Sequence, residues 1–436
     1  MDDNIDTIVI SVYVVINSLL WGIGARCVSF PHFVLFYVLF FFLSFDILVK
    51  AKCMFKLNEG QKDGIRRAIE WYFDPNKKNI FVLAGSAGTG KSTTASTLVS
   101  MLGLSSYQVL YCTPTGKAAA VLRSKGCIAN TIHSTFYHVF KNSNGRVSFA
   151  KKKSIPNVIK LILIDELSMV NGKMMEDILS FGIPILGLGD PGQLPPMYSA
   201  NPYIEHPDVF LEEIMRQNGE SGILTLATNA RKGIPITYGQ YNESRVVKLS
   251  EIHDIETYDM VICWTNESRK QLNSIIRKKL GFSSKYPSIG EKLMCLKNNY
   301  YHMIEGTTDD DIEVLVVNGM NCVALNTAKD DGDFLKMDYA PTYIKDKLFS
   351  TRVLKDVFDH YETGETEGED DNYSDIPEDV VVLDYGYAGT CHKCQGSEWS
   401  NVLVIDEFKG GEDMYNKWLY TAITRAKDRV TIARSI

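Results

Sequence analysis

A chain in which an apolar run leads directly into GSAGTGKS has few folds open to it. Here residues 80–83 are apolar, the glycine-rich segment occupies residues 85–92, and a helix-like stretch follows. The spacing is G-x-x-x-x-G-K-S, in the strand–loop–helix order that this motif requires. Its glycines let backbone amides converge on phosphate, the lysine offsets the charge of the β and γ oxygens, and the serine hydroxyl ligates Mg²⁺. The segment predicts a nucleotide site formed by Gly85, Gly88, Gly90, Lys91, Ser92 and Thr93.

A second apolar run, VIKLILIDE at residues 158–166, ends in two acidic residues. Such a run is typical of a buried parallel strand, and open α/β sheets bind their ligands at the carboxyl ends of those strands. We expect Asp165 to hold Mg²⁺ together with Ser92, and Glu166 to activate the attacking water. An acidic turn after an ordinary strand is the alternative, and the glycine-rich loop upstream argues against it.

Composition sets the outer bounds. The chain has 436 residues, 45% hydrophobic and 23% charged, which excludes a disordered chain and suggests two to four domains. The nine cysteines favour a reducing compartment, because an odd number does not fit a secreted disulfide framework. The net charge is −7, but residues 359–379 hold ten acidic side chains and no Lys or Arg, so the remainder carries +3. A mildly basic body of this kind leaves nucleic-acid binding open.

Two apolar runs, at residues 8–24 and 28–49, precede the globular pattern. The second is long enough to cross a bilayer, which takes roughly 20 apolar residues. Three interpretations of residues 1–53 remain open: a start of translation assigned too early, since Met54 directly precedes the globular pattern, a membrane hairpin, or a buried helix pair. We expect a cytoplasmic, intracellular protein that associates with a membrane only if residues 1–53 belong to it.

Eight further segments narrow the class of nucleotide-binding protein. They are LNEGQ (57–61), TPTGKAAA (113–120), TIHS (131–134), GDPGQLPP (189–196), MRQ (215–217), WTN (264–266), TCHKCQGSE (390–398) and YTAITRA (420–426). In this order and spacing, the set resembles the motifs of superfamily-1 DNA helicases, most of all the 5′→3′ branch of RecD-like and phage Dda-like enzymes. The resemblance runs from about residue 57 to about residue 432 and is weak near residues 325–380.

The resemblance implies an α/β fold with two RecA-like P-loop domains, at residues 54–219 and 220–436, and ATP bound between them. It implies an enzyme that couples Mg²⁺-ATP hydrolysis to 5′→3′ translocation on single-stranded DNA and to unwinding. Gln61 corresponds to the residue that reads adenine, and Gln193 to the one that senses the γ-phosphate. Arg216 and Arg425 correspond to arginine fingers. A surface ion pair is the alternative for each arginine.

The resemblance also implies a track for the nucleic-acid strand. Small hydroxyls, backbone amides and a few cations suit phosphate contacts without sequence readout. The corresponding residues are Thr113, Pro114, Thr115, Lys117, Thr131, His133, Ser134, Thr390, His392 and Lys393. The segment Cys-His-Lys-Cys at 391–394 departs from the family pattern. It offers only three ligands within four residues, so zinc binding is disfavoured.

Two inserts complete the expected architecture. Asn144-Gly145 lies between alternating residues and predicts a hairpin at about 137–157, where related helicases carry the pin that splits the duplex. We expect Phe149 or Phe140 to stack on a base and Lys151–Lys153 to contact phosphate, with a solvated hairpin as the alternative. A second small β insert is expected at about 320–380, and its acidic run 359–379 is predicted to be a flexible loop.

These expectations define the partners and the competing functions. The predicted partners are single-stranded DNA and duplex junctions, and replication, repair or recombination proteins are further candidates. One alternative function is a DNA-stimulated ATPase that remodels protein–DNA complexes without unwinding. Another is a membrane-tethered P-loop switch protein. Neither the preference for DNA over RNA nor the pathway follows from the residues.

Overall fold

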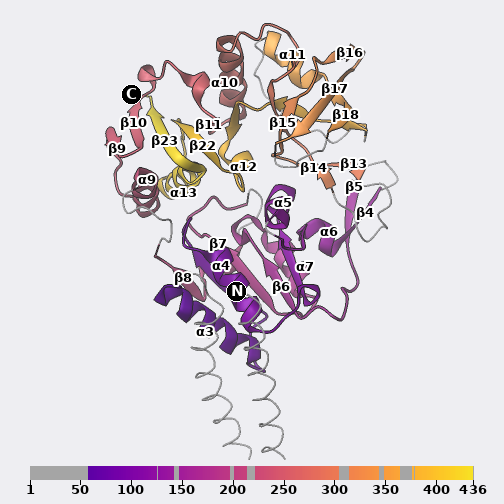
Figure 1. Cartoon of the computed structure of the whole chain (residues 1–436), viewed down its shortest axis with the longest axis vertical. Helices are drawn as coiled ribbons and strands as arrows, with labels where there is room; N and C mark the ends of the chain where they lie inside the picture. The colour runs from indigo at the N-terminus through magenta and orange to yellow at the C-terminus, as the bar shows by residue number, and fades with distance from the viewer. Residues whose placement is uncertain are drawn as a thin grey trace, which may run out of the picture. The chain divides into compact units, whose positions relative to one another are not determined.

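The computed structural model describes residues 57–124, 126–141, 147–196, 201–213, 221–303, 314–342, 348–363, 376–377 and 379–435. These residues form two six-stranded sheets, a seven-stranded sheet and two two-stranded ribbons (Figure 1). Within these ranges, no helix is long and apolar enough to span a bilayer. Residues 8–49 lie outside the described residues, so the interpretations of residues 1–53 stay open.

The first sheet is entirely parallel and is drawn in indigo to magenta in Figure 1. In spatial order its strands are β3 (Ala129–Thr131), β2 (Val109–Thr113), β6 (Leu161–Ile164), β7 (Ile185–Gly189), β1 (Ile80–Gly85) and β8 (Val209–Leu211). The strands β1, β6 and β7 are buried at every position, which explains their continuous apolar sequences. Because all strands run in one direction, the segments that follow them meet at one edge of the sheet.

Helices connect these strands. They are α3 (Glu59–Phe73), α4 (Lys91–Met101), η1 (Ser106–Gln108), α5 (Gly116–Ser124), α6 (Ile132–Phe136), η2 (Leu167–Met169), α7 (Gly172–Leu179) and α8 (Pro202–Glu205). Apolar residues from β1, β6, β7, α6 and α7 form a shared core, with Phe136, Ile164 and Met175 fully buried. The core fixes the backbone from which the glycine-rich loop and the acidic pair emerge.

The hairpin insert expected after α6 is present. Strands β4 (Tyr137–Lys141) and β5 (Val147–Lys151) pair antiparallel, with Val139 opposite Phe149. The Asn144-Gly145 turn itself lies outside the described residues.

The second six-stranded sheet is parallel except for its edge pair β9–β10. Its strands in spatial order are β21 (Ala388–Thr390), β11 (Met260–Cys263), β22 (Trp399–Asp406), β23 (Ala426–Arg434), β10 (Ser244–Lys248) and β9 (Gly239–Tyr241). Its helices are α9 (Gly222–Lys232), η3 (Leu249–Glu251), η4 (Ile255–Thr257), α10 (Asn266–Lys279), α12 (Cys391–Cys394) and α13 (Glu412–Ile423). Leu226 of α9 and Trp418 of α13 are buried in one core with the sheet.

The seven-stranded sheet is formed by residues inserted between β11 and β21 of the second six-stranded sheet. Its strands are β19 (Val380–Val381), β18 (Phe349–Leu354), β17 (Phe334–Pro341), β15 (Asn321–Ala324), β12 (Lys292–Cys295) and β20 (Leu383–Tyr385), and β16 (Lys329–Asp331) pairs with β17. Strands β13 (Asn299–Met303) and β14 (Val314–Val316) form a separate ribbon. The strands come from residues 292–385, a wider span than the expected 320–380.

The start of the acidic run departs from the sequence expectation. Residues Asp359–Thr363 were expected in a flexible loop, but they belong to helix α11 (Asp356–Thr363). Phe358 is fully buried, and the Tyr361 hydroxyl donates a 2.7 Å hydrogen bond to Asp384, so tertiary contacts hold this turn despite its charge. Residues 364–375 lie outside the described residues.

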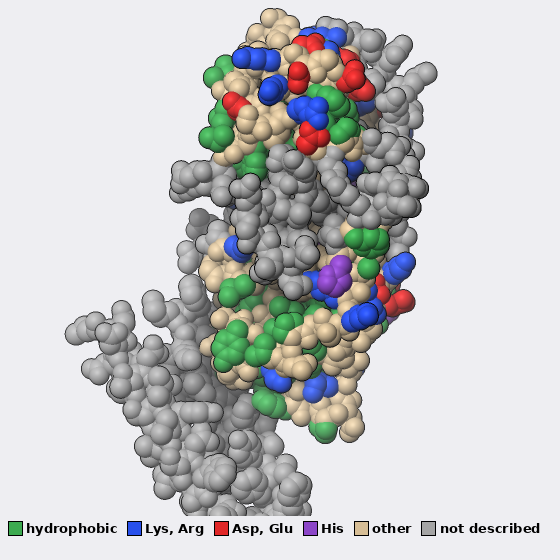
Figure 2. Space-filling view, turned by 90° about the vertical axis from the view of Figure 1, so that its right-hand side faces the viewer, with side chains coloured by type: hydrophobic (Ala, Val, Ile, Leu, Met, Phe, Trp, Pro, Cys, Tyr) green, Lys and Arg blue, Asp and Glu red, His purple; other side chains and the backbone are tan. Residues whose placement is uncertain are grey.

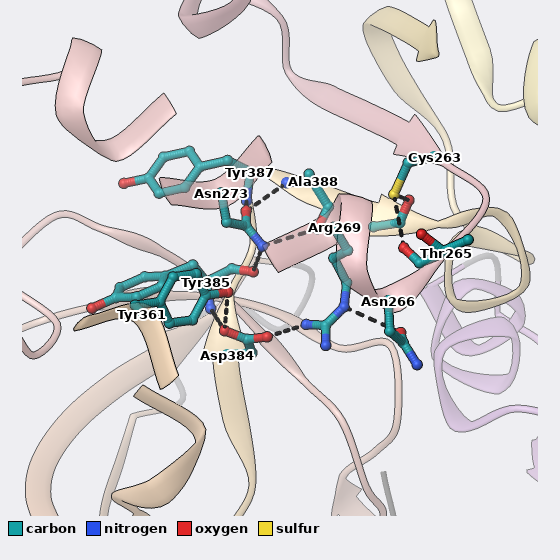
Figure 3. Close-up of polar contacts among 11 residues, drawn as sticks. Cys263, Thr265, Asn266, Arg269, Asn273, Tyr361, Asp384, Tyr385, Tyr387 and Ala388 are labelled. Carbon is teal, nitrogen blue, oxygen red and sulfur yellow. Dashed lines mark hydrogen bonds and ion pairs between the residues drawn. The ribbon is translucent and has the colours of Figure 1, made fainter. Parts of the chain in front are cut away.

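A buried polar network joins α10 to the insert (Figure 3). Arg269 of α10 forms an ion pair with Asp384 of β20, and both side chains are almost fully buried. The Tyr361 hydroxyl donates to the second oxygen of Asp384. One turn further along α10, the side-chain oxygen of Asn273 accepts a hydrogen bond from the backbone amide of Ala388 at 2.8 Å. The network thus ties α10, the insert strand β20 and the sheet strand β21 together.

Candidate active site

The glycine-rich loop after β1 has the backbone that its sequence predicts. A Cβ atom on Gly85 would lie 2.6 Å from the Thr89 hydroxyl and 3.0 Å from the Leu211 carbonyl oxygen, so no larger residue fits. Gly88 and Gly90 have φ values of 81° and 78°, in the left-handed region that favours glycine. The loop can therefore turn tightly and present its amides on one side.

The residues that begin α4 are the expected phosphate and metal ligands. The Lys91 ammonium group donates to the carbonyl oxygens of Gly85 and Ser86, at 2.8 and 3.0 Å, so it lies over the loop. Ser92 and Thr93 are exposed in the first turn of α4. The partial positive charge of a helix amino terminus adds to that of the lysine. This end of α4 is suited to bind phosphate groups.

The acidic pair follows β6 at the same edge of the sheet. An Asp165 carboxylate oxygen accepts the Glu166 amide at 3.0 Å. Glu166 has a φ of 59°, which is uncommon for a residue with a side chain and tends to occur at functional sites. Burial, reinforced by the charge of Asp165, raises the pKa of Glu166, and Arg425 and Lys91 oppose that rise. The acidic pair, the loop lysine and Arg425 therefore share one electrostatic environment.

The segment GDPGQ after β7 contributes Asp190 and Gln193. Asp190 is fully buried and accepts hydrogen bonds from the Gly192 amide and the Tyr420 hydroxyl. Gln193 is also buried, and its side-chain oxygen has no hydrogen-bond partner among the described residues. Buried polar atoms are nearly always paired, so this oxygen marks a position suited to a ligand or water.

Residues of α13, more than 200 positions away in sequence, complete the site. The Tyr420 hydroxyl accepts the amide of Ala87 in the glycine-rich loop at 3.1 Å and donates to Asp190. The Thr421 hydroxyl accepts the Leu194 amide at 2.9 Å. Sequence reasoning quoted Tyr420 within a motif but gave it no role. The sequence feature that could have identified Tyr420 is its place five residues before Arg425. Tyr420 lies on α13, and its hydroxyl reaches residues that follow strands of the first sheet.

The two expected arginine fingers have different outcomes. Arg425 is buried and donates to the carbonyl oxygens of Thr421 and Ser397, at 3.0 and 3.3 Å, and to the Thr424 hydroxyl. It has no carboxylate within ion-pair distance in the described part of the chain, so the surface ion pair is wrong for Arg425. Arg216 lies outside the described residues.

Gln61 lies in the first turn of helix α3. Its side-chain oxygen accepts the Asn58 amide at 3.1 Å, and its own amide donates to the Asn58 side chain at 2.7 Å. This reciprocal pair caps the helix. Contact of Gln61 with adenine stays a prediction.

In the first domain, the hydroxyl groups expected to contact the nucleic-acid strand make local hydrogen bonds, and those of Thr115 and Thr131 cap helices. The Thr115 hydroxyl accepts the Ala118 amide at 3.2 Å, and the Thr113 hydroxyl donates to the Thr115 carbonyl at 2.8 Å. Thr131 accepts the Ser134 amide at 3.2 Å at the start of α6. Capping orients the free amides of each first helical turn outward, where phosphate can reach them. Pro114 is half-buried between the two threonines.

Lys117 has an environment that the sequence did not predict. Its ammonium group donates to the Ser397 hydroxyl at 2.6 Å and lies 5.2 Å from the centre of the Trp399 ring. Both partners come from the second sheet and its preceding loop. Burial lowers the pKa of Lys117 to about 8. The residue therefore joins the two halves of the expected track.

Aromatic side chains gather where the hairpin meets α6. The His133 ring lies 5.0 Å from the Phe149 ring and 5.6 Å from the Tyr137 ring, and burial lowers the pKa of His133. Phe140 and Phe149 are 47% and 40% exposed. Of the three lysines at the end of the hairpin, Lys151 and Lys153 are exposed, and Lys152 donates to the Ser134 carbonyl oxygen.

Figure 2 views the side that carries the hairpin and the insert sheet. Basic and acidic side chains are interspersed over its upper part, whereas its lower part has many basic side chains and few acidic ones (Figure 2). A surface of the second kind is suited to a polyanion.

The second sheet brings the remaining expected track residues together at α12. Thr390 is buried directly before the helix, and the His392 ring lies 6.1 Å from Trp264. Burial lowers the pKa of His392. Lys393 is half-buried, and the carbonyl oxygen of Lys393 would lie 3.1 Å from a Cβ atom on Gly319 of the insert. The cysteines on either side of this pair are buried thiols.

A phosphate-binding loop, an acidic pair and a buried arginine directly before β23 define a P-loop nucleotide-binding protein. The family described as "AAA domain" matches residues 56–251, and the family described as "UvrD-like helicase C-terminal domain" matches residues 385–433. In these two matches the chain is similar to the superfamily-1 helicases of the RecD-like and Dda-like branch.

Two curated relatives carry the same similarity. The chain is 28% identical over 374 residues to the ATP-dependent RecD2 DNA helicase of Deinococcus radiodurans, covering 82% of this chain and 47% of that protein. It is 26% identical over 359 residues to the ATP-dependent DNA helicase dda of Enterobacteria phage T4, covering 73% of this chain and 75% of that protein. The chain thus spans about half the length of the first relative.

Solved structures share the fold. The chain resembles Bacteroides Pif1 bound to single-stranded DNA with a TM-score of 0.50 and 17% identity, over 86% of this chain and 92% of that one. A Pif1 structure that addresses unwinding at forked duplex DNA gives a TM-score of 0.51 with the same identity and coverage. These likenesses extend the mixed α/β fold with parallel sheets over most of the chain.

Proposed function

We propose that this chain is an ATP-dependent DNA helicase that moves 5′→3′ on single-stranded DNA and separates the strands of a duplex. The observation that carries the proposal is the convergence of Tyr420 and Arg425 of the second sheet on the phosphate loop and acidic pair of the first. A nucleotide bound there contacts both domains, so its hydrolysis changes how they associate. The RecD2 and dda relatives, named as ATP-dependent DNA helicases, support the same activity.

In this proposal, ATP binds with its phosphates on the loop at 85–92, where Lys91 offsets their charge and Thr93 lies in the same helical turn. Gln61 contacts adenine, and Glu166 accepts a proton from the attacking water. Gln193, whose side-chain oxygen is buried and unpaired among described residues, senses the terminal phosphate. Arg425, joined by Arg216, stabilises charge that develops on the transferring phosphoryl group.

The residues present also fit Mg²⁺. Ser92 and Asp165 offer hydroxyl and carboxylate oxygens, which are the hard ligands that this ion prefers. Ser92 follows the loop after β1, and Asp165 follows β6. Both strands pair with β7, so the two groups belong to the same edge of one sheet. When bound, Mg²⁺ supplies positive charge to the β and γ oxygens of ATP.

The strand track is proposed to cross both domains. The capped starts of α5 and α6 offer amides and hydroxyls from the first domain, and Thr390, His392 and Lys393 offer contacts from the second. These contacts involve the backbone of the strand, so they can re-form one nucleotide further along. We propose domain limits at 54–219 and 220–436, with the RecA-like sheets as motor domains.

The hairpin favours strand separation over remodelling of protein–DNA complexes. Phe149 remains substantially exposed although its ring lies near His133, and Phe140, on the other face of the hairpin, is also exposed. An exposed ring at a junction can stack on a base. We therefore propose that β4–β5 acts as the pin.

The test is unwinding of duplexes with a 5′ or a 3′ single-stranded tail, in DNA and RNA versions, with ATP and Mg²⁺. We expect unwinding of 5′-tailed DNA by the wild-type protein and none by Lys91→Ala, whose loop has lost its phosphate-binding charge. Strand-stimulated ATP turnover without unwinding of any substrate would favour the remodelling function. Unwinding from 3′ tails alone would contradict the proposed direction.

A further inference from the structure

Arg231, on the last turn of α9, contacts three segments of the nucleotide site. Its guanidinium group donates a hydrogen bond to the hydroxyl of Ser86 in the phosphate loop and lies 4.9 Å from the centre of the Phe210 ring. Its side-chain stem passes 3.1 Å from the position that a Cβ atom would take on Gly192, two residues after Asp190. A larger residue at position 192 would displace the arginine, so the turn before Gln193 is shaped around it.

Arg231 also lines a cavity of about 230 Å³ beside the loop. Ser86, Ala87, Tyr420 and Thr424 line the same cavity. The Ala87 amide points at the Tyr420 hydroxyl, 3.1 Å away, so this amide is exchangeable with another acceptor. The cavity is therefore lined both by the arginine and by the residue that carries this backbone amide donor.

The charge balance around Arg231 favours an anion. Glu212 is the acidic residue among those that line the cavity, and it forms no ion pair with Arg231. Among the described residues, the guanidinium group has the neutral Ser86 hydroxyl as its hydrogen-bond partner. A guanidinium group has five donors in a planar fork that matches the oxygens of a phosphate or carboxylate far better than a hydroxyl. Its contact with Ser86 leaves most of that capacity unused.

We infer that Arg231 is a further nucleotide-binding residue, which contacts the terminal phosphate of a nucleoside triphosphate and leaves Ser86 when that phosphate arrives. The inference deepens the proposed function, because it adds a cation from α9 to the same site. A diphosphate lacks the group that Arg231 contacts, so the residue distinguishes ATP from ADP. Since α9 packs against α13 in the core of the second domain, this contact transmits the presence of the terminal phosphate to that domain.

The competing role is structural. Arg231 could serve solely to tie α9 to the loop through Ser86 and to Gly192 through its stem. Loss of the side chain would then loosen the loop for every nucleotide alike. The two roles differ in how ATP and ADP binding respond, and in the effect of removing Ser86.

The test measures ATP and ADP affinity by displacement of a fluorescent nucleotide, in the presence of Mg²⁺ and without DNA. The variants are Arg231→Ala, Arg231→Lys and Ser86→Ala, with Lys278→Ala as the control that removes an exposed cation from the same domain. We expect Arg231→Ala to weaken ATP binding at least tenfold and ADP binding less than twofold, with partial recovery in Arg231→Lys. Ser86→Ala should bind ATP more tightly, because the arginine loses its resting partner.

Equal weakening of ATP and ADP by Arg231→Ala, or no weakening of either, would overturn the inference. The binding readout keeps this outcome separate from the proposed function. If the wild-type protein unwinds DNA but Arg231→Ala still prefers ATP over ADP as the wild-type protein does, only the inference about Arg231 is contradicted. Arginine-dependent ATP discrimination in a protein that never responds to DNA contradicts the helicase function alone.

Discussion

The contacts between α13 and the glycine-rich loop, which border the site called here the nucleotide cleft, differ physically from the network around Arg269. Across the cleft, the contacts are hydrogen bonds with at most one charged partner, such as Tyr420 with the Ala87 amide and Thr421 with the Leu194 amide. The network is built on the buried Arg269–Asp384 ion pair. A typical hydrogen bond contributes about 0.5–1.5 kcal/mol, whereas breaking a buried ion pair costs about 3–5 kcal/mol. We therefore expect the cleft to open and the insert sheet to stay with the second domain.

Two buried amide side chains, Asn273 in the network and Gln193 in the nucleotide site, differ in how fully they are paired. In the network, the Asn273 side chain donates to the carbonyl oxygen of Tyr385 and accepts the amides of Tyr387 and Ala388. In the cleft, the Gln193 side-chain oxygen has no partner in the described ranges. A buried unpaired polar atom costs about 1–3 kcal/mol, which is tolerated where a ligand completes the site.

The largest expected effect is on catalysis in the cleft. Glu166→Gln should reduce ATP hydrolysis by roughly 10²–10⁴-fold, because an amide cannot take the proton of the attacking water while Asp165 still binds Mg²⁺. Steady-state ATP turnover with saturating single-stranded DNA measures this loss. Glu176→Gln, an exposed position on α7, is the matched control and should retain full turnover. A loss of less than threefold in Glu166→Gln would locate the base elsewhere.

The next effect concerns stability in the network. Asp384→Asn should lower the free energy of unfolding by about 3–5 kcal/mol, because it leaves the buried Arg269 charge uncompensated. Denaturant unfolding followed by circular dichroism measures the change. Asp330→Asn removes an exposed partner of Lys355 and should leave the free energy of unfolding nearly unchanged, because surface ion pairs contribute little. Equal losses in the two variants would mean that the network is no stiffer than a surface pair.

The smallest effect is a pH dependence at Lys117. Burial lowers the pKa of Lys117 from 10.5 to about 8. The charged lysine, which donates to Ser397, therefore reduces the stability of the folded state at low pH, and this loss of stability disappears as the pH rises from 8 to 10.5. Attraction to strand phosphate needs the charged form. Affinity for single-stranded DNA, measured by fluorescence anisotropy, should therefore fall between pH 7 and 9.

Two variants sharpen the pH prediction. Lys117→Ala should bind more weakly at pH 7 and lose the pH dependence in this window, whereas Lys117→Arg should bind with little change across it. The same decline in all three proteins would attribute the titration to another group.

Local motifs explain what the sequence could predict. The loop at 85–92, the acidic pair after β6 and the hairpin strands depend on residues close together in the chain, and each lies where the spacing indicates. The roles of Arg231 and Tyr420 could not be predicted from local patterns. Arg231 contacts Ser86 across 145 positions of sequence, and Tyr420 contacts Ala87 across 333. No local pattern carries such a contact.

The acidic run shows a second limit of sequence reasoning. Its charge density indicated a loop, but Phe358 and Tyr361 supply the packing that keeps Asp356–Thr363 helical. Tertiary contacts override local composition where even two buried side chains are available.

The central claim, that ATP is hydrolysed between the two domains, is tested most directly by the steady-state kinetics of Arg425→Ala. Its charge, held by the Thr421 and Ser397 carbonyls, is positioned to meet charge that develops during phosphoryl transfer. We expect kcat to fall by roughly 10³-fold or more while the KM for ATP changes by less than about threefold. A variant with normal kcat and a raised KM would contradict the account, because Arg425 would then bind the ground state and the second domain would take no part in catalysis.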